Sequence, residues 1–252
     1  MTIDGATPAT SFTFHHFGLI VTGKGERMAL GHLFRSLTVH GCCHFEVIRQ
    51  IGQRSPQTSE RVKLKMVNTG KLLPTKDVEE IGLPARRYLD RPEKHVIVID
   101  DMEADRVPQA HQVFARYRTA LDTILGQPER SRASVHFLVN MLEAYYFADA
   151  AAINSVLDTE VTDYETDVEL IPHPKNDLKR LFRGFDETEH GVEILQRLDI
   201  PHVLSNPLTC SSLRTLFKWC WISFGSPEEN RFCFQTGRLY DVTSNQCLSL
   251  SF

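Results

Sequence analysis

The segment that most constrains the fold runs from His95 to Asp105 and reads His-Val-Ile-Val-Ile-Asp-Asp-Met-Glu-Ala-Asp. A β-branched run at 96–99 leads directly into four acids within six positions. An apolar run of this length that ends in polar residues is typical of a strand buried on both faces of a parallel sheet. Open α/β sheets bind ligands at the carboxyl ends of such strands. Because crowded carboxylates repel one another unless a cation or a proton intervenes, the cluster predicts a site for a hard cation such as Mg²⁺.

A second strand, followed by a glycine loop, lies near the N-terminus. Residues 17–21 predict a buried strand, and the loop Thr-Gly-Lys-Gly separates it from Glu26. The apolar residues that follow recur at helical spacing and predict a helix that begins near Glu26: Leu30, Leu33, Phe34 and Leu37. Strand, loop and helix form the first half of a βαβ unit. Gly23 and Gly25 would let the backbone approach a phosphate and Lys24 adds charge, although the full phosphate-loop spacing of nucleoside triphosphatases is absent.

The middle of the chain predicts further α/β units. Strands are expected at 45–51 and 134–139, and helices at 77–89 (interrupted at Gly82 and Pro84), 108–125 and 140–149. Glu143 falls in the first turn of the last helix, where a carboxylate can also simply favour the helix macrodipole. We therefore expect an α/β fold with a mostly parallel, Rossmann-like sheet, helices on both faces, and acids from three segments at one edge.

The character of the sequence changes after residue 150. Short helical segments are expected between proline-containing loops, at 150–157, 176–182, 191–198 and 211–221, and a weak alternation at 231–250 predicts a hairpin. The expected organisation is a flexible leader at 1–14, an α/β core at 15–150 with an insertion at 38–94, and a mainly helical C-terminal extension at 151–252 packed on the core.

The charge balance gives no general attraction to nucleic acid. The chain has 252 residues, 42% of them hydrophobic and 24% charged, with a formal net charge of −4. Contact with nucleic acid must therefore come from local basic residues or through a bound metal. A basic segment, 49–65, begins at the end of the predicted strand 45–51. On the simplest interpretation it is a solvated loop, and otherwise it is the first candidate for phosphate contacts. Its basic residues are Arg49, Arg54, Arg61, Lys63 and Lys65.

Other composition features concern the cellular compartment. No apolar run is long enough to span a bilayer, and the N-terminus lacks the layout of a secretory signal. The six cysteines include no Cys-x-x-Cys pair, which favours a cytoplasmic protein with reduced thiols. The segment His40-Gly-Cys-Cys-His44 offers four zinc ligands, but no second pair stands at zinc-finger spacing, so a structural zinc is not favoured.

With these motifs in place, the chain resembles the TOPRIM domain, which is found in topoisomerases, primases and overcoming-lysogenization-defect nucleases. Within that superfamily it is most similar to a bacterial group known as a domain of unknown function and often found in defence islands. The resemblance extends over residues 15–225, and the matching segments are 18–26 with the helix that follows, 96–103, 135–149 and 174–179.

The resemblance implies a role for each acid of the first two motifs. Glu26 takes the position of the acid/base glutamate, and Asp101-Met-Glu103 takes that of the Asp-x-Asp pair that binds Mg²⁺ or Mn²⁺. Glu103 replaces the second aspartate and lengthens that ligand by one methylene. Asp100 is a rival ligand, because adjacent strand residues point to opposite faces, and Asp105 closes the acidic cluster.

Nuclease members of the superfamily add a further acid and a lysine, for which Glu143 and Lys175 are the candidates. Lys175 is otherwise a plain surface lysine. Asp100 follows Glu26 by 74 positions, a spacing that is long for the core motif and suggests the insertion at 38–94.

The resulting hypothesis is a Mg²⁺-dependent nuclease that cleaves phosphodiester bonds of DNA or RNA, and the resemblance adds a role as the effector of a bacterial antiphage system. The alternative is a non-catalytic module of the same fold that docks on a partner ATPase; the glutamate at position 103 and the absence of net basic charge motivate it. A homodimer is a further candidate assembly. An aspartyl phosphatase with its nucleophile at Asp100 or Asp101 is less favoured, because the Asp-x-Asp-x-Thr spacing is absent.

Overall fold

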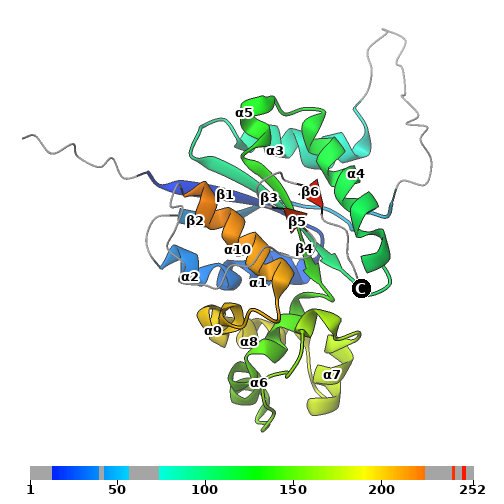
Figure 1. The fold of residues 1–252 in the computed structure, drawn as a ribbon, viewed down its shortest axis with the longest axis vertical. Coiled ribbons are helices and arrows are strands. Elements are labelled where there is room, and N and C mark those ends of the chain that lie inside the picture. Colours follow the sequence, from blue (N-terminus) through cyan, green and yellow to red (C-terminus); the bar gives the residue numbers. More distant parts are fainter. Residues whose placement is uncertain (1–12, 40–42, 57–73, 225–239, 242–245, 248–252) are drawn as a thin grey trace, which may run out of the picture.

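A four-stranded, all-parallel sheet forms the centre of the protein (Figure 1). The computed structural model describes residues 13–39, 43–56, 74–224, 240–241 and 246–247. The strands are β1 (His15–Val21), β2 (Cys43–Gln50), β3 (Lys94–Met102) and β4 (Ala133–Val139), in the spatial order β2-β1-β3-β4. They correspond to the four predicted strands, and the predicted α/β class with a parallel sheet is confirmed. The apolar part of β3 is fully buried, as a central parallel strand requires.

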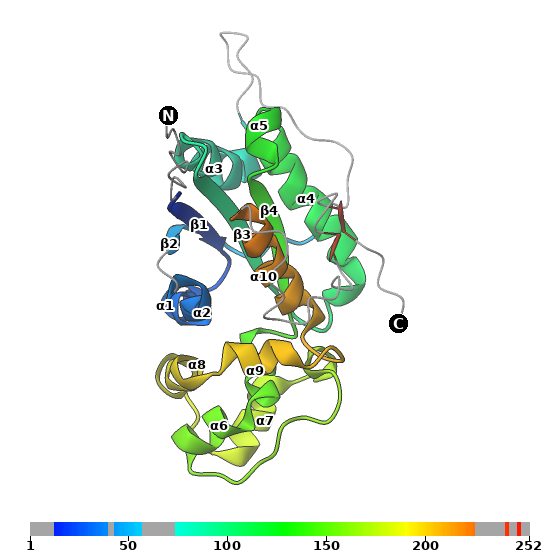
Figure 2. The same cartoon turned by 60° about the vertical axis from the view of Figure 1, so that its left-hand side comes forward.

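One face of the sheet is covered by α1 (Lys24–Leu33), α2 (Arg35–Thr38) and α10 (Ser211–Ser223). Phe17 of β1 stacks on Phe45 of β2 with ring centroids 4.6 Å apart, and Phe34 stacks on the same ring at 4.1 Å. Trp219 of α10 meets Phe17 edge-on at 6.1 Å. Figure 2 shows α10, the last long helix, lying across this face. The aromatic layer thus joins β1 and α10, which are far apart in the sequence, in one core.

The opposite face carries α3 (Leu83–Tyr88), the 3₁₀ turn η2 (Val107–Gln109) and α4 (Ala110–Asp122). Tyr88 packs directly on the backbone of β1, because a Cβ atom at Gly18 would lie 2.8 Å from its ring. The short α5 (Gln127–Arg130) then leads into β4. Helices therefore lie on both faces, as the sequence predicts.

A helical lobe, residues 142–205, follows β4 and lies beyond the carboxyl ends of the strands (Figure 2). It contains η3 (Leu142–Ala148), α6 (Ala150–Leu157), η4 (Val168–Leu170), α7 (Pro174–Leu181), η5 (Glu187–Gly191), α8 (Val192–Arg197) and α9 (Ile200–Ser205). The predicted segment 140–149 is a 3₁₀ helix rather than an α-helix. Helix α9 was not predicted: Pro201 suggests a loop, but it lies in the first turn, where a proline is tolerated, and Asp199 accepts a hydrogen bond from the backbone N–H of His202 at 3.2 Å.

The segment predicted as an insertion, 38–94, contributes to the sheet domain itself. Strand β2 pairs with β1 over its length, and α3 packs on the sheet. The helix before β3 is also continuous where an interruption was predicted, because the π turn η1 (Val78–Gly82) leads directly into α3. Pro84 lies in the first turn of α3 after this wider turn.

Several predicted segments fall wholly or partly outside the described residues: leader residues 1–12, residues 40–42 of the His40–His44 motif, the basic residues Arg61, Lys63 and Lys65, and most of the hairpin at 231–250. Within the last segment, β5 (Tyr240–Asp241) pairs antiparallel with β6 (Gln246–Cys247). Among the helices that the structure describes, none combines the length and the apolar character needed to cross a membrane.

Candidate functional site

The site lies where the strand order of the sheet reverses direction. From β1 the chain crosses through α1 to β2 on one side, whereas β3 lies on the other side of β1 and is followed by α4 on the opposite face. The crevice between the carboxyl ends of β1 and β3 is the usual ligand position in such sheets. A pocket of about 490 Å³ opens there. We call this space the edge pocket. Its lining comes from the sheet domain and from the helical lobe, and it includes Thr22, Gly23, Asp101, Glu143, Lys175 and Glu187.

The alternation of side chains along β3 separates the two adjacent aspartates. Asp101 lines the edge pocket. Asp100 points to the opposite face, is fully buried, and accepts hydrogen bonds from Arg106, with Nη2–Oδ2 at 2.7 Å, and from the Tyr117 hydroxyl at 2.9 Å. Thr22 donates a further bond to its Oδ1 at 3.0 Å. The structure therefore places Asp100, a predicted metal ligand, in an internal ion pair outside the edge pocket.

The backbone of Asp101 is fixed from three directions. Its carbonyl oxygen accepts hydrogen bonds from Arg106 Nη1 at 2.6 Å and Gln53 Nε2 at 3.2 Å, and its N–H donates to Thr22 Oγ1 at 3.4 Å. Arg106 also binds the carbonyl of Arg54 at 2.9 Å, which ties the loop after β2 to the end of β3. The side chain of Asp101 thus projects from a rigid strand end, as a ligand-binding position requires.

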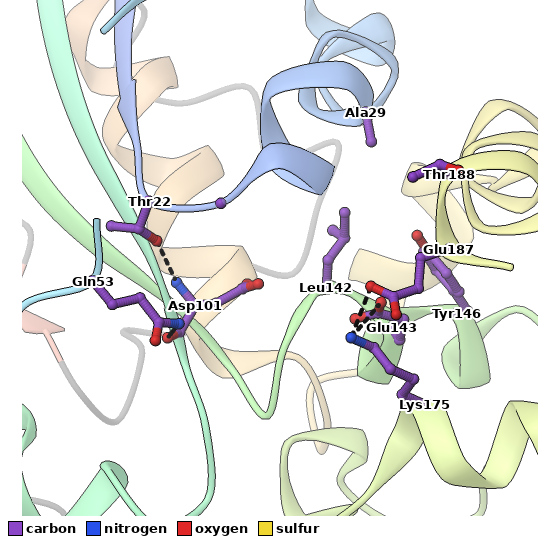
Figure 3. Close-up of a pocket in the computed structure, with 11 residues that line it drawn as sticks. Thr22, Ala29, Gln53, Asp101, Leu142, Glu143, Tyr146, Lys175, Glu187 and Thr188 are labelled. Carbon is purple, nitrogen blue, oxygen red and sulfur yellow. Dashed lines mark hydrogen bonds and ion pairs between the residues drawn. The ribbon is translucent and has the colours of Figure 1, made fainter. Parts of the chain in front are cut away.

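The opposite wall of the edge pocket belongs to the helical lobe. Figure 3 shows Thr22, Gln53 and Asp101 on one side and Glu143, Lys175 and Glu187 on the other. Lys175 Nζ lies 2.8 Å from Glu187 Oε2 and 3.9 Å from Glu143 Oε1. Partial burial alone would lower the pKa of Lys175, but the bond to Glu187 and the nearby carboxylates outweigh burial and raise the pKa. Lys175 is therefore a permanent cation at neutral pH rather than a base.

Tyr146 of η3 adds a hydroxyl to the same pocket. Its ring is buried, and burial together with the charges of Glu143, Asp101 and Glu187 raises the pKa of the phenol well above 10. The group stays protonated, and it can donate a hydrogen bond to an anionic ligand.

Glu103 and Asp105 do not line the edge pocket. Both are exposed after β3 and face a neighbouring pocket of about 360 Å³, which Asn140 and His173 also line. Lys175 lines both pockets, so the two spaces adjoin at this side chain. Asp101 and Glu103 of the predicted Asp-x-Glu pair thus point into adjacent spaces rather than the same one.

The predicted phosphate loop and Glu26 lie where β1 passes into α1. Gly23 lines the edge pocket, and α1 begins at Lys24, so Glu26 lies in the first turn of that helix. The side chains of residues 24–26 fall outside the description. Among the side chains that the structure does describe, no three of the acid, histidine or cysteine type are grouped so as to hold a metal ion.

The two predicted arginine contacts differ in their surroundings. Arg49 is exposed on β2. Arg54 is 7% exposed and forms ion pairs with Asp77, Nε–Oδ1 at 2.8 Å, and with Glu80. The guanidinium of Arg54, which the sequence analysis offers as a phosphate contact, is thus held in internal ion pairs.

The sequence analysis did not single out several residues that line the edge pocket, among them Tyr146, Glu187 and Gln53. Tyr146 sits in an apolar run, which suggests a core residue. Glu187 belongs to the acidic segment 186–189, which is typical of a solvated helix start, and Gln53 lies in a polar loop. No local pattern distinguishes them, because each reaches the pocket through a long-range contact.

Comparison with known proteins gives one family match. The family model described as Domain of unknown function (DUF4276) matches residues 21–219, which include every residue that lines the edge pocket. No curated protein and no solved structure matches the chain.

Proposed function

The chain belongs to the family described as Domain of unknown function (DUF4276), and from that premise we propose that its edge pocket is the active site of a Mg²⁺-dependent nuclease of TOPRIM type. The observation that carries the proposal is the meeting of Asp101, Glu143 and Lys175 in one pocket. These residues come from β3, from η3 and from α7, and the pocket lies at the switch point of the sheet.

The donor chemistry of the pocket suits a hard divalent cation. Asp101 and Glu143 supply carboxylate oxygens, which Mg²⁺ prefers. A third acid has to complete the set, and Glu26, in the first turn of α1 beside Gly23, is the candidate. A bound Mg²⁺ would supply Lewis-acid stabilisation of the negative charge on a phosphate.

The chain's own groups supply the rest of the proposed chemistry. Lys175 provides a fixed positive charge toward a phosphate, and Tyr146 provides a protonated hydroxyl as a hydrogen-bond donor. The N-terminal end of α1 presents backbone N–H groups beside Gly23, which favours an anion at the same point. Glu26 would act as the general acid/base, the role that the TOPRIM resemblance gives to the glutamate after the first strand.

The test combines metal binding with cleavage. Calorimetric titration with Mn²⁺ and Mg²⁺, and cleavage of labelled single- and double-stranded DNA and RNA, would be measured for the wild type, Glu26→Gln and Asp101→Asn. Both variants should lose at least tenfold in metal affinity and at least a hundredfold in cleavage rate, on the order expected for first ligands of a catalytic ion. Glu193→Gln, on the exposed face of α8, is the matched control and should behave as the wild type. Cleavage by Asp101→Asn at the wild-type rate would overturn the proposal.

A second function, a non-catalytic module that docks on a partner ATPase, is favoured by the ion pairs of Lys175. Lys175 already compensates part of the negative charge of Glu143 and Glu187 without a metal. A wild-type chain that binds neither Mn²⁺ nor Mg²⁺ would support this alternative.

A role as an antiphage effector is tested by induced expression in bacteria. Wild-type protein should slow growth and degrade nucleic acid, whereas Asp101→Asn at an equal protein level should not. Equal growth inhibition by both proteins would exclude cleavage as the cause.

A further inference from the structure

The chain between β4 and η3 makes a bend of unusual backbone conformation. Asn140 and Met141 both have positive φ, 56° and 71°, and Met141 combines its value with a ψ of 166°. Positive φ with an extended ψ is a conformation that essentially only glycine adopts without strain. Two consecutive non-glycine residues with positive φ persist only where surrounding contacts hold them.

Hydrogen bonds on both sides hold the bend. The backbone N–H of Asn140 donates to the carbonyl of Met102 at 2.8 Å, and the side-chain amide of Asn140 donates to the carbonyl of Glu169 at 2.7 Å. Just beyond the bend, the Ala144 N–H donates to the carbonyl of Met141 at 3.2 Å. The end of β3, the lobe segment η4 and the first turn of η3 thus all bind the same few residues.

A buried carboxylate braces these contacts from behind. The Tyr145 hydroxyl accepts a bond from the Val139 N–H at 3.0 Å and donates to Glu169 Oε1 at 3.2 Å. The same Oε1 accepts from the Ser212 N–H at 2.7 Å, in the first turn of α10. The bend is therefore fixed to β4, to η4 and to α10 at once.

The bend determines which residues reach the two pockets. Asn140 and Met141 line the pocket beside Glu103, and the next residues, Leu142 and Glu143, line the edge pocket. A negative φ at Met141 would change the direction in which η3 leaves β4, and this would displace Glu143 from the wall opposite Asp101. Strain retained at this point is best explained by a requirement for that placement.

We propose that the Asn140–Met141 bend is a positioning device that holds Glu143 in the edge pocket. Asn140 is the positioning residue, because its side-chain amide donates a hydrogen bond to the carbonyl of Glu169. The proposal rests on the function proposed above, because it takes Glu143 as a ligand of the catalytic ion.

The test separates backbone strain from loss of a side chain. Met141→Gly removes both, whereas the matched variant Met141→Ala removes most of the side chain and keeps the strain. Met141→Gly should raise Tm above that of Met141→Ala by about 2–4 °C, because relief of strain outweighs the entropy that glycine adds to the unfolded chain. Because glycine adopts this φ and ψ without strain, the bend should persist in Met141→Gly, and Mn²⁺ binding should stay within about twofold of the wild type. Met141→Val, whose β-branched side chain disfavours positive φ, should weaken Mn²⁺ binding about tenfold and lower kcat more than it changes KM. Met141→Ala should bind Mn²⁺ within about twofold of the wild type, the small change expected when a residue that supports no ligand is truncated.

A crystal structure of Asn140→Gly supplies a readout that does not depend on activity. Glu143 should lie away from Lys175 in that structure, and a Glu143 carboxylate still beside Lys175 would overturn the proposal. Asn140→Gly keeps access to positive φ but loses the side-chain hydrogen bond to the carbonyl of Glu169. It should show the same loss of Mn²⁺ affinity as Met141→Val. Unchanged Mn²⁺ affinity and kcat in Met141→Val and Asn140→Gly would overturn this inference alone. A wild type that binds no Mn²⁺ would overturn the proposed function and this inference with it.

Discussion

Two adjacent carboxylates at the end of β3 serve different purposes because successive residues of a strand point to opposite faces. Asp101 faces the edge pocket, and Asp100 faces α4, where Arg106 and Tyr117 surround it. Buried ion pairs of this kind become costly when one partner is removed, because the other charge is left without compensation.

Asp100→Asn is therefore expected to lower the free energy of unfolding by about 3–5 kcal/mol, the range for breaking a buried pair. Urea unfolding measures the change. Asp105→Asn, at an exposed position of the same loop, should alter stability by less than about 0.5 kcal/mol. The double variant Asp100→Asn/Arg106→Met should be more stable than Asp100→Asn alone, and strictly additive effects would show that the pair is not coupled.

His136 is the clearest pH-sensitive residue. Its side chain is buried, its Nε2 lies 2.8 Å from Ser134 Oγ, and burial lowers the pKa to about 3. In the unfolded chain the ordinary pKa of about 6.5 applies, so the unfolded state takes up a proton between these values and the folded state does not. The stability contributed by the neutral ring is thus present above pH 6.5 and lost as the pH falls below it.

Acidification from pH 7.5 to 5 should therefore cost the wild type up to about 2 kcal/mol more than His136→Gln, which cannot titrate. Urea unfolding at the two pH values measures the difference. Ser134→Ala, which leaves the imidazole in place, should keep the wild-type pH slope. Parallel pH dependences of the wild type and His136→Gln would contradict the assignment.

At the scale of elements, the close crossing of η1 and α4 depends on the absence of a side chain. A Cβ atom at Gly82 would lie 2.5 Å from the carbonyl oxygen of Ala120, so only glycine permits this approach. The contact explains why the helix runs through Gly82 where local propensity predicts an interruption: tertiary packing against α4 compensates for the flexibility of glycine.

Gly82→Ala should destabilise the protein by about 1–3 kcal/mol, since the overlap is with rigid backbone. Gly31→Ala, in the last turn of α1, is the matched control, because nothing lies within 4 Å of its added Cβ. That variant should be neutral or more stable by about 0.5–1 kcal/mol through helix propensity. Thermal unfolding of both variants tests the pair, and an equal loss in the two would contradict the packing argument.

On the scale of the whole molecule, Glu169 connects the helical lobe to the sheet domain. It accepts bonds from Tyr145 of η3 and from the Ser212 N–H of α10, and its own carbonyl binds Asn140. Burial, with a smaller contribution from the charge of Asp167, raises the pKa of Glu169 to about 7. The folded state therefore holds a proton between pH 4.5 and 7 that the unfolded state has already lost.

The contribution of Glu169 is thus favourable below pH 4.5 and is lost as the pH rises to about 7. Relative to the wild type, Glu169→Gln should gain up to about 2–3 kcal/mol of stability as the pH is raised from 5 to 8. Urea unfolding at the two pH values measures this difference. Glu165→Gln, an exposed residue of the same connection, serves as the control and should show no such trend. A constant difference between wild type and Glu169→Gln would place the titration elsewhere.

The sequence by itself determined the elements that carry the site. Apolar runs at 17–21, 96–99 and 134–139 form buried parallel strands because β-branched residues favour that environment, and parallel strands bring their carboxyl ends to one edge. That reasoning is local, and it correctly placed β1, β3 and β4 and the helices that follow β1 and β3, whereas the segment after β4 is a 3₁₀ helix rather than the predicted α-helix.

Only the tertiary structure decided which side chains share the edge pocket. The packing of α1 and α4 on opposite faces of β3 decides that Asp101, and not Asp100, faces the edge pocket. Arg54 is buried because Asp77 and Glu80 approach it from a distant helix. Glu187 reaches Lys175 through the packing of the helical lobe. The physical reason is that periodicity reports the neighbours of a residue along the chain, whereas a pocket is made by residues that meet only when separate elements pack.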